Sequence, residues 1–227
     1  MSSANPSALA DSEVHTLVDV AFPLRGRVVP RDHGYLLYGA ICRLLPQAHE
    51  GGWLAVHPLP GRIADQLLIL SPRPLLTLRV AAKDISRLLP LAGAKLRLGD
   101  HEIAVGTPNL FAVRPSSDLV SRQVVIRLTQ TPRKGDGTLD KEAMARSYLL
   151  EIQRQLHELG VSAEAELGPP RQITVQGRRV LGFTVRLHGL TPEDSLRVQA
   201  FGIGGKRAMG CGVFGPISTP TRPRKPQ

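Results

Sequence analysis

The chain has 227 residues, a length that suits one or two domains, and 42% of them are hydrophobic, which excludes a wholly disordered protein. Its formal net charge of +10 favours a polyanionic partner, nucleic acid before any other, because each neutralised phosphate releases a counterion. The sequence contains neither an apolar run of the ~18–20 residues that a spanning helix needs nor a secretory signal, so we expect a cytoplasmic protein without a membrane partner.

The first half of the chain predicts a strand at residues 14–22, a basic loop at 23–34 and a helix from residue 35. In this helix Leu37, Ile41 and Leu44 recur at helical spacing until Pro46 ends the run. The other elements expected here are short strands at 53–59, 65–71 and 75–80, a short helix at 83–91, and a hairpin at 95–105 that turns at Gly99-Asp100.

A linker at residues 107–118, which contains two prolines, is followed by a second set of elements. Asp140 is the expected N-cap of a long helix that Gly160 closes, and Thr191 is the expected N-cap of a second helix that stops at Gly202. The strands expected around these helices lie at 122–130, 163–168, 171–177, 179–189 and 213–217, with a turn at Gln176-Gly177.

Each half therefore approximates β-α-β-β-α-β, the ferredoxin-like (RRM-like) unit. We expect an α+β protein with two tandem ferredoxin-like domains, at residues 13–107 and 120–218. The polar residues 1–12 and 219–227 are expected to be disordered tails. The two cysteines, Cys42 and Cys211, have no metal-ligand spacing, so we expect reduced thiols, no metal and no cofactor.

A glycine-rich run, FGIGGKRAMGCGVFG, occupies residues 201–215. Its G-x-G-x-x-G at 210–215 is not a dinucleotide fingerprint, because a helix precedes it and Pro216 follows it. Its Gly-Lys-Arg at 205–207 is not a P-loop end, because Arg207 stands where Ser or Thr binds magnesium. The run is either an ordinary glycine-rich turn or a loop whose bare backbone and two cations bind phosphate. The predicted phosphate contacts are Gly202, Gly204, Lys206, Arg207, Gly210 and Gly212.

The run has a symmetric pattern between the last predicted helix and the last predicted strand. Gly-Ile-Gly at 202–204 is followed by five residues that contain both cations and then by Gly-Cys-Gly at 210–212. This spacing resembles the glycine-rich loop of the RAMP superfamily, the repeat-associated RNA-binding proteins of CRISPR systems. Two tandem ferredoxin-like halves with this loop in the second resemble the superfamily's endoribonuclease that cuts precursor CRISPR RNA within its repeats. The resemblance implies that repeat RNA is the partner, together with other proteins of a CRISPR effector complex. It also implies a catalytic histidine near the first helix.

Among the seven histidines, His33 is the best candidate for this role. It follows a basic loop that contains Arg25, Arg27 and Arg31, and it stands at the N-terminus of the first predicted helix, where free N–H groups favour phosphate. The other six are expected to serve packing or surface polarity.

Cleavage without a metal would use the RNA's own 2′-OH, leaving a 2′,3′-cyclic phosphate and a 5′-OH. A histidine suits the acid or base role because its pKa lies near working pH. The resemblance implies a supporting tyrosine, for which Tyr35 and Tyr38 are the candidates, and a supporting lysine. The chain has no lysine before Lys83, so an arginine, Arg31 or Arg43, or the cations of the glycine-rich run must stabilise the phosphorane.

Further RNA contacts are predicted from the basic residues of the second half: Arg133 and Lys134 before the long helix, and Arg171, Arg178 and Arg179 on the predicted hairpin. Two alternatives to the endoribonuclease stay open at this point. One is a non-catalytic RNA-binding subunit of a CRISPR effector complex, and the other is a general basic ferredoxin-like RNA-binding domain.

Overall fold

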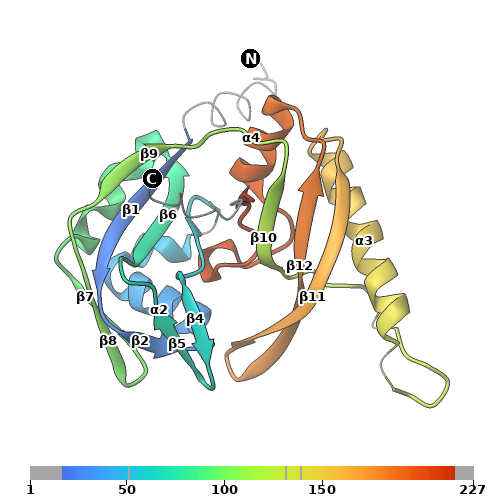
Figure 1. Cartoon of the computed structure of the whole chain (residues 1–227), viewed down its shortest axis with the longest axis horizontal. Helices are drawn as coiled ribbons and strands as arrows, with labels where there is room; N and C mark the ends of the chain where they lie inside the picture. Colours follow the sequence, from blue (N-terminus) through green and yellow to red (C-terminus); the bar gives the residue numbers. More distant parts are fainter. Residues whose placement is uncertain (1–16, 51, 131, 139, 218–227) are drawn as a thin grey trace, which may run out of the picture.

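The computed structural model describes residues 17–217, except residues 51, 131 and 139, and both predicted tails lie outside these residues. Two α+β halves lie side by side, the first drawn from blue to green and the second from green to red (Figure 1). Every strand pair in the three sheets is antiparallel. In the described part of the chain, no helix has the length and apolar character needed to cross a membrane.

The first half contains one α-helix, two 3-10 helices and nine strands within the described residues. They are β1 (Leu17–Arg25), β2 (Val28–Pro30), α2 (Gly34–Leu44), η1 (Pro46–His49), β3 (Ala55–Val56), β4 (Gly61–Ala64), β5 (Leu67–Leu70), β6 (Leu75–Ala81), η2 (Ala82–Leu91), β7 (Lys95–Leu98), β8 (His101–Val105) and β9 (Asn109–Ala112). The larger sheet has the order β3-β6-β1-β8-β7, with β9 also paired to β1, and β2-β5-β4 form a small sheet of their own. Helix α2 buries Leu37, Ala40 and Ile41 in the core of this half.

Three expectations for the first half are wrong in detail. The predicted basic loop contains β2, whose three residues pair with β5. The predicted linker contains β9, which pairs with β1 at residues 18–21. The helix expected at 83–91 is the 3-10 helix η2, with Pro90 inside it, because a proline removes a backbone donor from the α-helical ladder. Strands β2 and β9 are short, which makes their pattern weak.

The second half contains β10 (Leu119–Val124), α3 (Lys141–Glu158), β11 (Glu164–Val175), β12 (Arg178–His188), α4 (Pro192–Phe201), the 3-10 turn η3 (Arg207–Met209) and β13 (Gly215–Pro216). Its sheet has the order β11-β12-β10-β13, the strand order of a ferredoxin-like unit. A second hydrophobic core extends from Leu119 to Phe214. The tandem ferredoxin-like α+β fold is therefore confirmed, while the domain limits stay a prediction.

The helix limits of the second half follow from the predicted caps. The Asp140 carboxylate accepts a hydrogen bond from the Ala143 amide at 2.9 Å, and the Thr191 hydroxyl accepts one from the Asp194 amide at 3.1 Å. Gly202 ends α4 with φ of +68°. The strands predicted at 163–168 and 171–177 form one long strand, β11, with an irregularity between Leu167 and Pro170.

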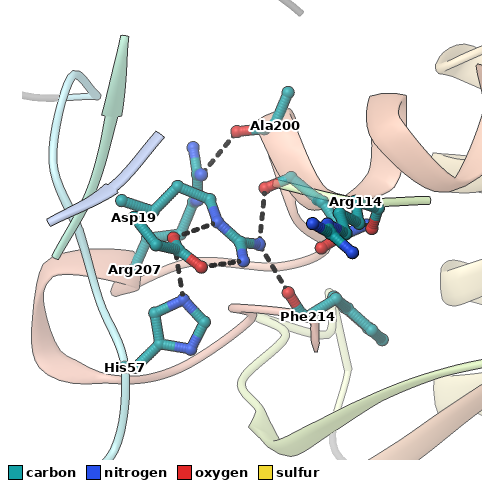
Figure 2. A network of polar contacts seen from close by, with 8 residues as sticks. Asp19, His57, Arg114, Ala200, Arg207 and Phe214 are labelled. Atoms are coloured by element: carbon teal, nitrogen blue, oxygen red, sulfur yellow. Dashed lines mark hydrogen bonds and ion pairs between the residues drawn. The ribbon is translucent and has the colours of Figure 1, made fainter. Parts of the chain in front are cut away.

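A buried ionic network joins the two halves (Figure 2). Arg79 of β6 is 3% exposed and donates two hydrogen bonds of 2.8 Å to Asp19 of β1. The same guanidinium donates across the interface to the carbonyl oxygens of Phe214, at 2.6 Å, and Gln199, at 3.3 Å. Because a buried guanidinium needs partners for all its donors, this network fixes the position of one half relative to the other.

Candidate active site

A cleft of about 630 Å³ lies between the two halves and contains His33; we call it the His33 cleft. Its lining from the first half comprises Arg31, Asp32, His33, Gly34, Pro58, Leu59, Ile63, Gln66 and Leu68. Its lining from the second half comprises Arg122, Gln123, Pro170, Arg171, Gln172, Ile173, Thr174, Arg179, Met209 and Gly210. In Figure 1 the hairpin β4–β5 of the first half lies next to the hairpin β11–β12 of the second half.

His33 is the residue that precedes α2, and its carbonyl accepts the first helical hydrogen bond, from the Leu37 amide at 2.7 Å. The imidazole Nδ1 lies 3.2 Å from the carbonyl oxygens of Pro30 and Arg31. Since carbonyl oxygens can only accept, Nδ1 carries the proton in these contacts. The neutral ring therefore has its lone pair on Nε2, which is the form that can take a proton from a substrate.

Burial lowers the pKa of His33 below its ordinary value of 6.5, and the positive charge of Arg122 adds to this decrease. The hydrogen bonds to Pro30 and Arg31 and the charge of Asp32 act in the opposite direction but do not cancel it. At neutral pH the imidazole is consequently neutral, and a neutral imidazole is ready to act as a general base.

The segment that carries His33 is tied to the second half. A carboxylate oxygen of Asp32 accepts a hydrogen bond from the backbone amide of Thr174 in β11, at 2.5 Å. The other carboxylate oxygen is buried without a partner among the described residues. Asp32 is thus a contact between the halves directly beside the candidate catalytic histidine.

The charge of the His33 cleft is mainly positive. Four arginines line it, Arg31, Arg122, Arg171 and Arg179, whereas Asp32 is the single acidic side chain among the described lining residues. Such a surface favours a polyanion. Over the whole described chain, no three His, Cys, Asp or Glu side chains gather closely enough to hold a metal ion.

The glycine-rich run forms a tight loop between α4 and β13. Its amides are already used inside the protein: Gly202 donates to Val198, Gly204 to the Gln155 side chain, Gly210 to Arg207 and Gly212 to Gln123. A Cβ on Gly212 would lie 2.2 Å from the Ile203 carbonyl oxygen, and one on Gly204 would lie 2.4 Å from that of Val125. All four amides thus have partners inside the protein, and Gly204 and Gly212 lie where a side chain would clash, while phosphate contact by these glycines stays a prediction.

The two cations of the loop have different surroundings. Lys206 is half-buried, and its side chain has no hydrogen-bond or ion-pair partner among the described residues. Arg207, expected at the exposed apex, instead points inward: its guanidinium donates to the Ala200 carbonyl at the end of α4 (Figure 2). Burial, together with the charge of Arg79, lowers the pKa of Arg207 to about 10. Its contacts are those of a residue that holds the loop in place.

The two candidate tyrosines do not line the His33 cleft. The Tyr38 hydroxyl lies 3.2 Å from Nδ1 of His49, and the two rings meet edge to face. Tyr35 lines a separate depression with Arg43 and Arg97. Of the predicted catalytic group, the cleft lining therefore brings together His33 and Arg31.

The predicted RNA contacts are likewise divided between the cleft and its surroundings. Arg171 and Arg179 line the cleft, and Arg178 is exposed at the start of β12. Arg25 and Arg27 are exposed on the first half, outside the lining. Arg133 and Lys134 are exposed in the loop that precedes α3, at the outer side of the second half (Figure 1).

Two lining residues of the second half, Arg122 and Gln123, were not among the sequence candidates. Both belong to β10, where a regular strand would place neighbouring side chains on opposite faces. Arg122 was the start of a predicted strand, and nothing local in the sequence indicated that the strand faces His33.

Comparison with known proteins finds relatives of the chain in sequence and in structure. Residues 18–219 match the family model described as Cas6 Crispr. The CRISPR-associated endonuclease Cas6 of Myxococcus xanthus (strain DK1622) is 37% identical over 199 residues, which cover 88% of this chain and 81% of that protein.

Solved structures agree with the fold. A Cas6-related protein from Pyrococcus furiosus superposes with a TM-score of 0.62 at 17% identity, over 89% of this chain and 98% of that one. A RAMP protein described as binding different RNA substrates superposes with a TM-score of 0.59 at 17% identity, over 90% of this chain and all of that one.

Proposed function

Because this chain belongs to the Cas6 family of CRISPR-associated endonucleases, we propose that it processes CRISPR RNA by binding a repeat of the precursor and cutting once within it. The observation that carries this proposal is a neutral histidine in a cationic cleft between two ferredoxin-like halves. The family assignment favours the endonuclease over both alternatives, the non-catalytic subunit and the general RNA-binding domain.

The proposed reaction is an internal transesterification that needs no metal. His33 Nε2 takes the proton of the 2′-OH, the 2′-oxygen bonds to the adjacent phosphorus, and the bond from phosphorus to the 5′-oxygen breaks. The departing 5′-oxygen gains a proton from solvent. His33 releases the proton that it took from the 2′-OH to solvent, so no proton is consumed overall. The products are a 2′,3′-cyclic phosphate and a 5′-OH.

The arginines of the cleft hold the phosphates on either side of the reacting bond. Arg31 adjoins His33, while Arg171 and Arg179 contact the RNA backbone from β11 and β12. The exposed Arg178, next to Arg179, and the half-buried Lys206 of the glycine-rich loop extend this contact. The exposed Arg25, Arg27, Arg133 and Lys134 add charge that attracts RNA from a distance.

The test is cleavage of labelled repeat RNA, with the sequence of the host's own CRISPR repeat, in EDTA. Wild-type protein is expected to cut once, and His33→Ala is expected to bind the RNA with similar affinity and leave it whole. His101→Ala, a change in the distant β7–β8 hairpin, is the control and should cut normally.

A substrate with a single 2′-deoxynucleotide before the cut identifies the nucleophile. Cleavage that persists on this substrate would contradict attack by the 2′-OH. Cleavage lost in EDTA and restored by magnesium would contradict a metal-independent reaction. Wild-type protein that binds the repeat but never cuts it would favour the alternative of a non-catalytic RNA-binding subunit.

A further inference from the structure

Strand β10 departs from regular pairing at the His33 cleft. Its partners in β12 are in register from Leu119 to Ser121 and again at Val124, with an irregularity between them. Arg122 and Gln123 are the two residues within this irregularity, and both line the cleft. Such a bulge re-aims side chains that strict alternation would direct to opposite faces. We call these two residues the β10 bulge.

The backbone of the β10 bulge is held from both sides. The Thr184 hydroxyl of β12 donates to the Arg122 carbonyl at 2.9 Å, and the Gly212 amide of the glycine-rich loop donates to the Gln123 carbonyl at 2.7 Å. A Cβ on Gly182 would lie 3.0 Å from Cγ of Gln123. The bulge is thus a fixed feature, built by β12 and the glycine-rich loop together.

The Arg122 side chain is held loosely where it lies. Its guanidinium donates one long hydrogen bond, 3.4 Å, to the Leu59 carbonyl, and no carboxylate pairs with it among the described residues. Arg79, by contrast, is neutralised by Asp19. Because Arg122 also acts electrostatically on the His33 ring, its unneutralised charge lies near the candidate base.

Gln123 offers a second unused donor. The residue is 7% exposed, and its side-chain amide nitrogen has no hydrogen-bond partner in the described structure. A buried donor without a partner is unfavourable, so an arriving acceptor in the cleft would stabilise it.

We propose that the β10 bulge binds the reacting phosphate: Arg122 donates to a non-bridging oxygen and stabilises the phosphorane, and Gln123 donates to the same nucleotide. This inference rests on the proposed function and adds to it a residue from the half opposite His33. The base and the charge-stabilising group thus approach the phosphate from different halves.

The test is single-turnover cleavage at saturating repeat RNA, with a normal scissile phosphate and with sulfur replacing either non-bridging oxygen. Arg122→Ala is expected to slow cleavage by about 100-fold or more, while RNA affinity changes by less than about threefold. Arg122→Lys should recover part of the rate. Gln123→Leu, which keeps the side chain's bulk, should slow cleavage by about tenfold. Arg127→Ala, an exposed arginine just beyond β10, is the matched control and should cut as wild type does.

The sulfur substrates separate phosphate contact from mere structural support. Wild-type protein should cleave one of the two sulfur isomers more slowly than the normal substrate, because sulfur accepts the guanidinium's hydrogen bond poorly. In Arg122→Ala this difference between the substrates should disappear. The Arg31→Ala variant should retain the slower cleavage of this sulfur isomer. If Arg122→Ala cuts at the wild-type rate, or retains the full sulfur effect, the inference is overturned while the proposed function stands. If wild-type protein itself does not cut, the proposed function has failed first.

Discussion

Asp32 and Thr174, 142 positions apart in the sequence, are joined across the His33 cleft by a hydrogen bond of 2.5 Å from the Thr174 amide to the Asp32 carboxylate. The acceptor belongs to the residue beside His33, and the donor belongs to the strand that carries Arg171. This bond sets the distance between the histidine and the opposite wall, so the alignment of the base depends on both halves at once.

Replacement of Asp32 should therefore raise the activation free energy of cleavage by more than it lowers the free energy of unfolding. Asp32→Ala removes the acceptor and is expected to slow single-turnover cleavage by about tenfold, the equivalent of one lost charge-assisted hydrogen bond. Asp32→Asn keeps an acceptor oxygen and should retain most of the rate. Equal loss in both variants, with RNA bound normally, would show that the carboxylate charge, not the bond to Thr174, is what matters.

The pH profile of cleavage should identify the role of His33. The neutral form is the active one for a general base, so the rate should rise as pH increases through the histidine's pKa and then level off. Because burial lowers this pKa, the midpoint should lie below 6.5. His188→Gln removes a surface histidine whose pKa is raised by its bond to Asp118, and it should leave the midpoint unchanged. A rate that falls between pH 5 and pH 8 would assign His33 as the acid.

Two glycines of α2 provide a matched pair for the contact between the helix and the glycine-rich loop. A Cβ on Gly34 would lie 2.5 Å from the Met209 carbonyl oxygen, whereas one on Gly39 would meet nothing within 4 Å. Gly34→Ala should destabilise the protein by ~1–3 kcal/mol, since the loop must move away. Gly39→Ala should stabilise it by up to ~1 kcal/mol. Urea unfolding measures both, and equal changes would contradict this packing.

A second pair tests whether the loop's glycines serve packing or phosphate binding. Gly212→Ala combines φ of +65° with a 2.2 Å approach to the Ile203 carbonyl oxygen, while Gly205 has open space at its Cβ position. The first change should lower the melting temperature by several degrees and the second should not. If both leave the melting temperature unchanged and weaken RNA binding alike, the loop grips phosphate through its backbone after all.

The buried ion pair between Asp19 and Arg79 should be a large contribution to stability. Asp19→Asn leaves the guanidinium without its carboxylate, and we expect a loss of ~3–5 kcal/mol in the free energy of unfolding. Arg154→Ala, which breaks an exposed ion pair on α3, is the control and should cost much less.

The same pair predicts a dependence of stability on pH. Burial by itself would raise the pKa of Asp19, but the bonds from His57 and Arg79 hold it well below 3.8. The native state therefore binds the proton less readily than the unfolded chain does, so this stabilisation is complete above pH 3.8 and is lost as pH falls. The Asp19→Asn protein should lack this component of acid sensitivity in unfolding measured at successive pH values.

The parts of the fold that could be predicted are those specified by local chemistry. The caps Asp140 and Thr191 and the turn at Gln176-Gly177 each depend on a few neighbouring residues, and all three are confirmed. Strands β2 and β9 were missed because their pairing partners, β5 and β1, are distant and their own patterns are short. Long-range pairing overrides a weak local pattern.

In the candidate site, too, local sequence could identify some residues and not others. His33 was identifiable from its position before a helix and after a basic loop, and it lines the cleft. Three other features depend on how the halves face each other. They are the inward turn of Arg207, the separation of Tyr35 and Tyr38 from the cleft, and the presence of Arg122 in it. No local spacing in the sequence encodes that arrangement.

The order of synthesis gives the glycine-rich loop a further consequence. A nascent chain exposes His33 early, but the wall formed by Met209 and Gly210 emerges only after nearly all of the three sheets has been translated. Until then, Gln123 lacks the Gly212 amide that secures its backbone, and Gly34 lacks the loop that packs on it. A ribosome-bound or prematurely terminated chain that ends before Gly202 would therefore contain the histidine without an assembled cleft. The cleft is therefore complete only late in translation, once the loop that contains Met209 and Gly210 has been made.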